Sequence, residues 1–145
     1  MAKSKSASSD SANPKKLLLE AAALGLKNSY SPYSKFPVGA AVLTDKGIFY
    51  GCNVENASFG GTVCAERVAF LKAKSEGAKK FYDVLVLTPR ETPVPPCGLC
   101  LQTMAEFLPP HGKVYLATTG KGRTKDLTFQ QLLPESFSRK DLVSG

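Results

Sequence analysis

Apolar residues along the chain follow two spacings, which predict helices alternating with strands. Over residues 14–27, leucine and alanine are dense and favour a buried helix. A loop rich in turn residues follows at 29–37. Two runs rich in β-branched and apolar residues, 38–44 and 47–55, are then separated by an Asp-Lys-Gly turn. They predict a two-stranded hairpin.

The second half of the chain continues the alternation. Between Thr62 and about Ser75 the apolar residues recur at helical spacing, with Thr62 available as the amino-terminal cap. The remaining expected elements are a strand at 81–89, a helix at 97–108, a strand at 113–119, a short edge strand at 124–127 and a closing helix at 129–137. This order predicts an α/β fold, with a mostly covered sheet and parallel crossovers.

The amino-terminal residues differ from the rest in composition. Residues 1–14 are rich in serine, lysine and alanine and lack apolar spacing, so we expect a disordered tail before a single domain at 15–145. The net charge of +7 would suit an anionic partner, but part of it lies in this tail. Because no basic stretch is interleaved with aromatic residues, nucleic acid is not an expected partner.

Neither a secretion signal nor a membrane span is expected. Serine, aspartate and asparagine occupy the region where a signal peptide has its apolar run. The most apolar stretch, residues 17–26, is interrupted by Glu20 and is shorter than the roughly 20 residues that a spanning helix needs. We therefore expect a cytoplasmic protein. In a reducing compartment, four cysteines indicate metal binding or catalysis rather than disulfides.

Three of the cysteines lie where two helices are expected to begin. Cys64 stands two positions before Glu66, and Cys97 and Cys100 form a Pro-Cys-x-x-Cys motif. The partial positive charge at a helix amino terminus stabilises a thiolate and prepares it to bind metal. A structural zinc site normally has four protein ligands, and we find no fourth. Three thiolates therefore predict a catalytic zinc ion with one position open for water.

Glu66 has a role in such a site. Zinc lowers the pKa of a bound water, so that hydroxide is available near neutral pH to attack a ring carbon. Glu66 is expected to take the water proton and to pass it to the ring nitrogen and then to the leaving ammonia. Because three thiolates over-neutralise a divalent cation, Arg67 is the candidate to donate hydrogen bonds to the sulfurs. Cys-x-Glu with Pro-Cys-x-x-Cys is a signature of zinc deaminases.

Further motifs extend the match beyond the metal ligands. The runs FPVGAAV, GCNVENASFG, TVCAER, PCGLC and LLPESF resemble the small homotetrameric, zinc-dependent cytidine deaminases from about Lys16 nearly to the carboxyl end. The resemblance implies a three-layer α/β/α fold with a mixed, mostly parallel five-stranded sheet. It also implies one zinc ion per subunit. The implied reaction, a step of pyrimidine salvage, converts cytidine or deoxycytidine to the uridine product and releases ammonia.

The resemblance also implies a substrate site. Asn53 and Glu55 are expected to hydrogen-bond the ribose hydroxyls, and Phe36 to stack on the pyrimidine. Phe59 and Phe137 are expected to reach the pocket of a neighbouring subunit. From the residues alone, an ordinary core aromatic is the favoured interpretation of each phenylalanine, and only the resemblance assigns these residues to the site. The residues that the resemblance assigns to substrate binding are Phe36, Asn53, Glu55, Phe59, Ala65 and Phe137.

One position departs from the family pattern. Leu101 follows the second zinc cysteine of the Pro-Cys-x-x-Cys motif, where the family usually has arginine. The missing charge keeps open a related deaminase that acts on another amino-heterocycle, such as blasticidin S or a different nucleoside. A protein that uses zinc only for folding is the further alternative, but it would not need Glu66 beside the metal. The sequence does not rank cytidine against deoxycytidine.

Overall fold

The computed structural model describes residues 13–143, which form five helices and five strands. The helices are α1 Pro14–Lys27, α2 Ala65–Ser75, α3 Gly98–Phe107, α4 Phe129–Leu132 and α5 Arg139–Leu142, with a 3-10 turn, η1, at Phe59–Gly61. The strands are β1 Gly39–Thr44, β2 Gly47–Cys52, β3 Phe81–Thr88, β4 Lys113–Thr118 and β5 Thr124–Thr128. Most of the tail expected at 1–14 lies outside the described residues. Its last two residues start α1, where Asn13 caps the helix and Pro14 takes the first helical position.

The five strands form one mixed sheet in the order β2-β1-β3-β4-β5. This confirms the expected mixed five-stranded sheet, but the expectation that it is mostly parallel is wrong. Among the five strands of the described chain, only β3 and β4 pair in parallel. The hairpins β1-β2 and β4-β5 are antiparallel because short turns join them. The β1-β2 hairpin also places β1 between β2 and β3. The crossover from β2 through α2 to β3 therefore does not create a parallel pair.

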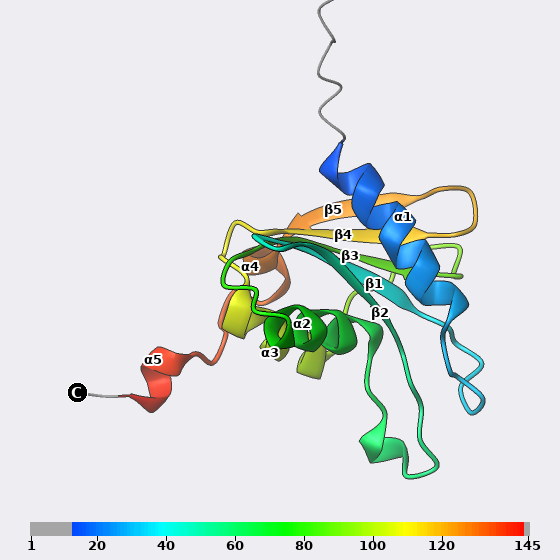
Figure 1. Ribbon diagram of the computed structural model, residues 1–145, viewed down its shortest axis with the longest axis horizontal. Coiled ribbons are helices and arrows are strands. Elements are labelled where there is room, and N and C mark those ends of the chain that lie inside the picture. The colour runs from blue at the N-terminus through cyan, green and yellow to red at the C-terminus, as the bar shows by residue number, and fades with distance from the viewer. Residues whose placement is uncertain (1–12, 144–145) are drawn as a thin grey trace, which may run out of the picture.

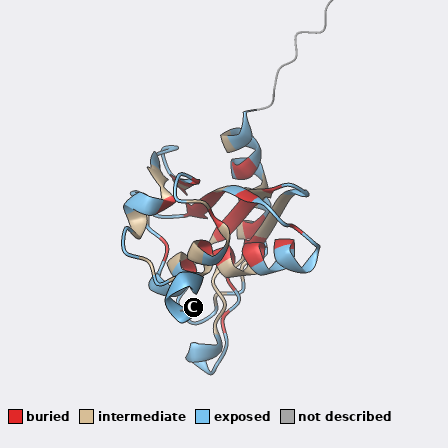
Figure 2. Ribbon diagram, turned by 90° about the vertical axis from the view of Figure 1, so that its left-hand side faces the viewer, coloured by how far each residue is buried: buried red, intermediate tan, exposed pale blue. Residues whose placement is uncertain are grey.

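Helices cover both faces of the sheet (Figure 1). On one face α1 buries Leu18 and Ala22 against side chains of β1, β3 and β4. On the other face α2 and α3 bury Phe70 and Met104 against the alternate residues of the same strands. Figure 2 shows the buried residues concentrated in the sheet and on the helix faces that contact it. The three-layer α/β/α architecture is confirmed.

Two element boundaries differ from the sequence prediction. The second helix begins at Ala65 with Cys64 as its N-cap, not at Thr62, because Val63 pairs with Val54 and stays extended. The expected closing helix is only one turn long, because Pro134 follows α4 closely and cannot continue it. Within residues 13–143, no helix is long and apolar enough to cross a membrane.

Close approach of α1 to the sheet requires glycine at position 39. A Cβ atom added there would clash with the carbonyl oxygen of Ala22 and would lie 2.6 Å from the amide nitrogen of Leu26. Both atoms belong to the backbone, so relief would require movement of α1. Residue 39 begins the strand that leads on from the loop carrying Phe36, so this contact also supports one wall of the site described below.

Gly39→Ala is therefore expected to reduce the free energy of unfolding by about 3 kcal/mol or more, because it overpacks a backbone contact. Urea unfolding followed by circular dichroism measures the change. Gly120→Ala is the control, since an added Cβ there meets no atom within 4 Å. It should change the unfolding free energy by less than about 0.5 kcal/mol. Equal stability of the two variants would contradict the close packing of α1.

Candidate active site

The metal-ligand candidates lie at the amino termini of α2 and α3. Cys64 and Cys97 are the N-cap residues of these helices, and neither side chain caps its own helix. Cys100 lies in the first turn of α3 and is fully buried. The pairing of Val63 with Val54 and the buried Pro96 fix the two chain entries. Cysteines far apart in the sequence are thereby brought together.

The three sulfur atoms have the spacing that zinc requires. The Sγ atoms of Cys64 and Cys97 are 3.8 Å apart, and those of Cys97 and Cys100 are 3.5 Å apart. All three lie within 4.8 Å of one another. Tetrahedral zinc with sulfur ligands at about 2.3 Å separates the sulfurs by about 3.8 Å. The residues fit a zinc ion with three thiolate ligands.

No fourth protein ligand joins this cluster among residues 13–143. Cys52 lies elsewhere, where its Sγ donates to the carbonyl oxygen of Asn28 at 3.3 Å. The chain has a single histidine, His111, which lines a separate groove beside Lys79 and Pro109. A site with three protein ligands leaves one position of a tetrahedral metal for water, as catalytic zinc sites do.

The environment of the sulfurs favours negative charge on Cys64. A hydrogen bond from Cys100 lowers the pKa of Cys64 to about 5 against the effect of burial, and Cys97 and Arg67 contribute in the same direction. The pKa of Cys100 is raised correspondingly, because its proton is shared with Cys64. A cysteine must lose its proton to bind a metal. The cluster thus stabilises a thiolate before any metal binds.

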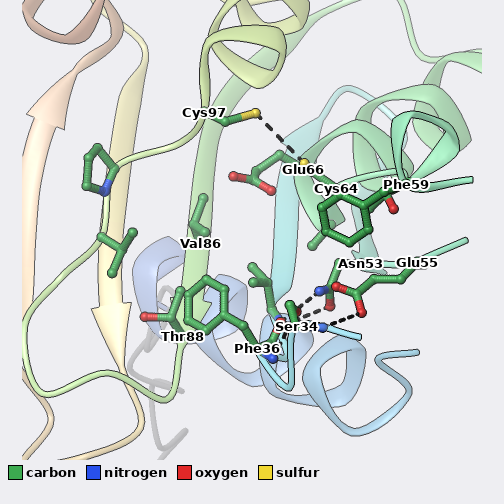
Figure 3. Close-up of a pocket in the computed structure, with 15 residues that line it drawn as sticks. Ser34, Phe36, Asn53, Glu55, Phe59, Cys64, Glu66, Val86, Thr88 and Cys97 are labelled. Atoms are coloured by element: carbon green, nitrogen blue, oxygen red, sulfur yellow. Dashed lines mark hydrogen bonds between the residues drawn. The ribbon is translucent and has the colours of Figure 1, made fainter. Parts of the chain in front are cut away.

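Glu66 lies beside these sulfurs in the first turn of α2. Its carboxylate points toward the space next to Cys64 and Cys97 (Figure 3). Only 5% of the residue is exposed, and this burial raises its pKa to about 7. Near neutral pH, a carboxyl group of this kind can both accept and release a proton.

Arg67 follows Glu66 and turns back toward the chain that enters α2. Its Nη2 donates to the carbonyl oxygen of Thr62 at 2.8 Å. Its buried Nε has no hydrogen-bond partner among the described residues. Burial alone would lower the pKa of Arg67, but the approach of Cys64 raises it above its usual value. A cationic donor therefore lies next to the sulfurs.

A cavity of about 370 Å³ opens in front of Glu66 and the cysteines. Most residues expected at the substrate site line it. Figure 3 shows Phe36 and the pair Asn53 and Glu55 at the end away from the sulfurs. The expected site residues that line this cavity are Phe36, Asn53, Glu55, Phe59, Cys64, Ala65, Glu66 and Cys97.

The polar end of the cavity is rigidly hydrogen-bonded. Oε1 of Glu55 accepts from the backbone N–H groups of Tyr33 and Ser34, at 2.9 and 3.0 Å. Burial acts to raise the pKa of Glu55, but the hydrogen bonds from Ser34 and Tyr33 outweigh it and hold the pKa below its usual value. Oε2 of this ionised carboxylate makes no such bond within the described chain.

Asn53 holds the neighbouring loop in place. Its Oδ1 accepts from the hydroxyl of Ser29 and, at 2.9 Å, from the backbone N–H of Val38. Its Nδ2 donates to the carbonyl oxygen of Phe36 at 2.8 Å. A carboxamide nitrogen carries two hydrogens, so one N–H of Asn53 is left for a ligand.

Phe36 is positioned by an unusual turn. Lys35, immediately before it, has a φ angle of +55°, in the left-handed region that costs a residue with a side chain about 1–2 kcal/mol. The backbone N–H of Phe36 donates to the hydroxyl of Ser34, and its carbonyl oxygen accepts from Asn53. This turn directs the half-buried ring into the cavity wall.

The two remaining aromatics differ from each other. Phe59, in η1, is 59% exposed and lines the cavity of its own chain. Phe137, between α4 and α5, is 55% exposed and does not line this cavity. Its carbonyl oxygen accepts from Gln102 of α3. Contact of either ring with a neighbouring subunit remains a prediction.

Part of the cavity wall was not predicted from the sequence. Val86 and Thr88 come from the carboxyl end of β3, the strand that has a parallel partner. Ligands often bind at the carboxyl ends of parallel strands, so the position of Val86 and Thr88 at such an end could have indicated that they line the site. The sequence indicates only a helix-cap role for Thr62. The unpredicted lining residues are Ser34, Val38, Thr62, Val86, Thr88, Val94 and Pro95.

Comparison with known proteins identifies the family. Residues 12–118 match the model of the cytidine and deoxycytidylate deaminase zinc-binding region. A cytidine deaminase from Sporosarcina psychrophila is 49% identical over 80% of this chain and 85% of its own length. The crystal structure of cytidine deaminase from Burkholderia pseudomallei matches with a TM-score of 0.79 and 39% identity, over 84% of this chain and 98% of that one. The chain belongs to the cytidine deaminase family.

The match extends to distant organisms and to the metal site. A probable cytidine deaminase from Dictyostelium discoideum is 41% identical over 87% of this chain and 85% of its own length. The zinc-binding region of the family model spans Cys64, Cys97 and Cys100. The predicted zinc cofactor is confirmed at the level of the family, and the cysteine cluster is compatible with it.

Proposed function

We propose that this cytidine deaminase family member hydrolyses cytidine or deoxycytidine to uridine or deoxyuridine and ammonia. The observation that carries the proposal is the buried Glu66 beside three sulfurs, at one end of a cavity whose other end is polar. A cytosine nucleoside fits these two ends, since its base carries the amino group that is removed and its sugar carries hydroxyls that can hydrogen-bond the polar end. The cavity volume of about 370 Å³ is within the usual range for small-molecule sites.

Each residue of the metal end has one role in this proposal. Cys64, Cys97 and Cys100 would hold zinc, which when bound supplies a water of lowered pKa as the source of hydroxide for C4 of the base. Glu66 takes the proton from this water and delivers it to N3 of the ring. It then moves a second proton from the hydroxyl now bound to C4 to the exocyclic nitrogen, and the C4–N bond breaks as the C4 carbonyl forms and ammonia leaves. The net reaction converts one water and one cytidine to one uridine and one ammonia.

Arg67 is proposed to moderate the charge of the metal end. Its unpartnered buried Nε lies on a side chain whose pKa responds to all three cysteines. Donation to a thiolate would reduce the negative charge that three sulfur ligands place on the metal. Lower negative charge on the metal favours ionisation of its water. The backbone of Ala65, which also lines the cavity, is proposed to contact the base.

Asn53 and Glu55 are proposed to bind the ribose hydroxyls. The free Oε2 of Glu55 would accept from a hydroxyl, and the remaining N–H of Asn53 would donate to one. Both groups are buried, so a bare base would leave them without partners and would bind poorly. The site therefore favours a nucleoside over free cytosine.

Glu55→Gln is expected to raise KM for cytidine about 10- to 100-fold, because the charged Oε2 acceptor is replaced by an amide NH2 group, which cannot accept from the ribose hydroxyl. The Gln carbonyl can still accept from Tyr33 and Ser34, so the fold should be retained. Steady-state kinetics of cytidine deamination measures the change, with kcat falling much less than KM rises. Unchanged KM would contradict the assignment of Glu55 to the sugar.

Leu101 does not support a different substrate class. Its side chain packs against the core cluster of α2, α3 and the sheet, and it does not line the cavity. The departure from the usual arginine therefore alters the support of α3 rather than the surface that meets the ligand. This favours a cytosine nucleoside over blasticidin S or another amino-heterocycle.

Assembly and cellular role are the finer parts of the proposal. We propose a homotetramer in the cytoplasm that serves pyrimidine salvage, as the family resemblance implies. The exposed Phe137 lies just before α5, which projects from the body of the chain in Figure 1. This placement suits contact with a neighbouring subunit. Exposed Leu99, at the start of α3, adds apolar surface.

A substrate panel tests the proposed function. Purified zinc-loaded protein is incubated with cytosine, cytidine, deoxycytidine, the 5′-phosphates of these two nucleosides, adenosine and blasticidin S, and ammonia release is followed. We expect turnover of cytidine, deoxycytidine or both, and little of cytosine. Preferential turnover of blasticidin S or adenosine would overturn the substrate class. Turnover of cytosine without turnover of either nucleoside would overturn the sugar site.

A further inference from the structure

Phe36 has a cationic neighbour that none of the roles above includes. The guanidinium carbon of Arg90 lies 4.8 Å from the centre of the Phe36 ring. This is within the distance at which a cation is attracted to an aromatic ring. Arg90 follows the end of β3 and is exposed at the start of the proline-rich loop. It does not line the cavity itself.

The position of Arg90 follows from the strand that precedes it. Val86 and Thr88 alternate along β3 and both face the cavity. Figure 3 shows Thr88 beside the Phe36 ring. Arg90 comes two residues later and reaches the same ring. Residues of β3 and its extension thus form one support for an aromatic side chain that belongs to a different loop.

No other interaction accounts for the placement of Arg90. Among residues 13–143, the structure records a single salt bridge, between Lys15 and Asp126. It also records no hydrogen bond from the Arg90 side chain to that part of the chain. The Phe36 ring is therefore the one partner of this guanidinium in the described structure.

We infer that Arg90 is a positioning residue that holds the Phe36 ring in the orientation needed to receive the pyrimidine. The inference rests on the proposed function. The turn at Lys35 and two hydrogen bonds fix the backbone of Phe36, but only packing restricts the rotation of its ring. A ring that is already fixed spares the entropy cost of ordering it when substrate binds. Loss of Arg90 should therefore weaken substrate binding and leave the chemistry at Glu66 unchanged.

Arg90→Gln tests the inference against a matched control. The chain contains a second cation over an aromatic ring at the same distance, Lys72 over Tyr50 at 4.8 Å, and neither residue lines the cavity. We expect Arg90→Gln to raise KM for cytidine about 2- to 5-fold with kcat unchanged. Lys72→Gln should leave both constants unchanged, and Arg90→Lys, which keeps the cation, should recover part of the loss. Equal KM values for Arg90→Gln and Lys72→Gln would overturn the inference.

A double-mutant cycle separates positioning from direct contact. In a Phe36→Leu background, Arg90→Gln is expected to have no further effect on KM, because the ring through which it acts is gone. An undiminished effect in that background would mean that Arg90 contacts the ligand, and would overturn the positioning role. We expect Phe36→Leu and Arg90→Gln to be coupled in their effects on KM and to show no coupling in kcat.

Nuclear magnetic resonance tests the contact without any turnover. In protein with ¹³C-labelled phenylalanine, the ring resonances of Phe36 should shift in Arg90→Gln and not in Lys72→Gln. Unchanged Phe36 resonances in Arg90→Gln would overturn the inference even if cytidine is a substrate. Because this measurement needs no substrate, failure of the inference is distinguishable from failure of the proposed function.

Discussion

The Glu66→Gln variant is expected to retain zinc and the native fold while its kcat for cytidine falls about 100- to 10,000-fold. Glutamine has nearly the same shape and can occupy the same buried position, but it cannot accept and release a proton. The reaction requires two proton transfers. Glu66 lines the cavity beside Cys64 and Cys97, where the base would lie, so its carboxylate is placed to make both transfers. Stopped assays of uridine formation measure the loss in rate.

Glu76→Gln provides the control for this change. Glu76 is the exposed C-cap of the same helix, and its side chain lies far along α2 from the cysteines. Its replacement should leave kcat and zinc content unchanged. Metal analysis and circular dichroism of both variants check that the effect belongs to the chemical step. Near-normal turnover by Glu66→Gln would remove the acid-base role of Glu66.

The second large effect is expected from Cys100→Ser. Cys100 is fully buried, and its sulfur lies 3.5 Å from that of Cys97. Serine binds zinc much more weakly than thiolate, so the variant should lose zinc to a chelator that leaves the wild type loaded, and should lose its activity with it. Because bound metal stabilises only the folded chain, the melting temperature should also fall.

Cys52→Ser is the matched control for Cys100→Ser. Cys52 donates to the carbonyl oxygen of Asn28, a bond that a serine hydroxyl can also make. This variant should keep full zinc content and activity. Zinc content and melting temperature, measured for both variants under the same dialysis conditions, give the comparison. Equal zinc loss in the two variants, or full zinc retention by Cys100→Ser, would contradict the assignment of Cys100 as a ligand.

The metal end of the site was predictable because its chemistry is local in the sequence. Cys64 and Glu66 lie together at one helix start, and Cys97 and Cys100 at another, so spacing indicates which side chains meet within each motif. The zinc-deaminase signature then joins the two motifs in one site. The strands and helices were predictable for a similar reason, since burial imposes its period on each segment separately. The short edge strand β5 was also expected, but its burial pattern shows no such alternation.

The sheet order and the cavity wall depend on contacts between distant segments. The apolar pattern of β1 identifies a strand but does not state its neighbours, and its position between β2 and β3 is what makes the sheet mostly antiparallel. Likewise, Thr88 and Val94 carry no motif, and they reach the cavity through the packing of β3 and the loop after it. The start of α2 was misplaced because the pairing of Val63 with Val54 is also a tertiary contact.

The central claim is a zinc ion held by three sulfurs with one position open to solvent. X-ray absorption at the zinc edge of the purified protein tests it most directly. The account predicts one zinc ion per chain, with three sulfur neighbours at about 2.3 Å and one oxygen neighbour at about 2.0 Å. Absence of zinc, or a fourth sulfur or an imidazole nitrogen in place of the oxygen, would contradict it.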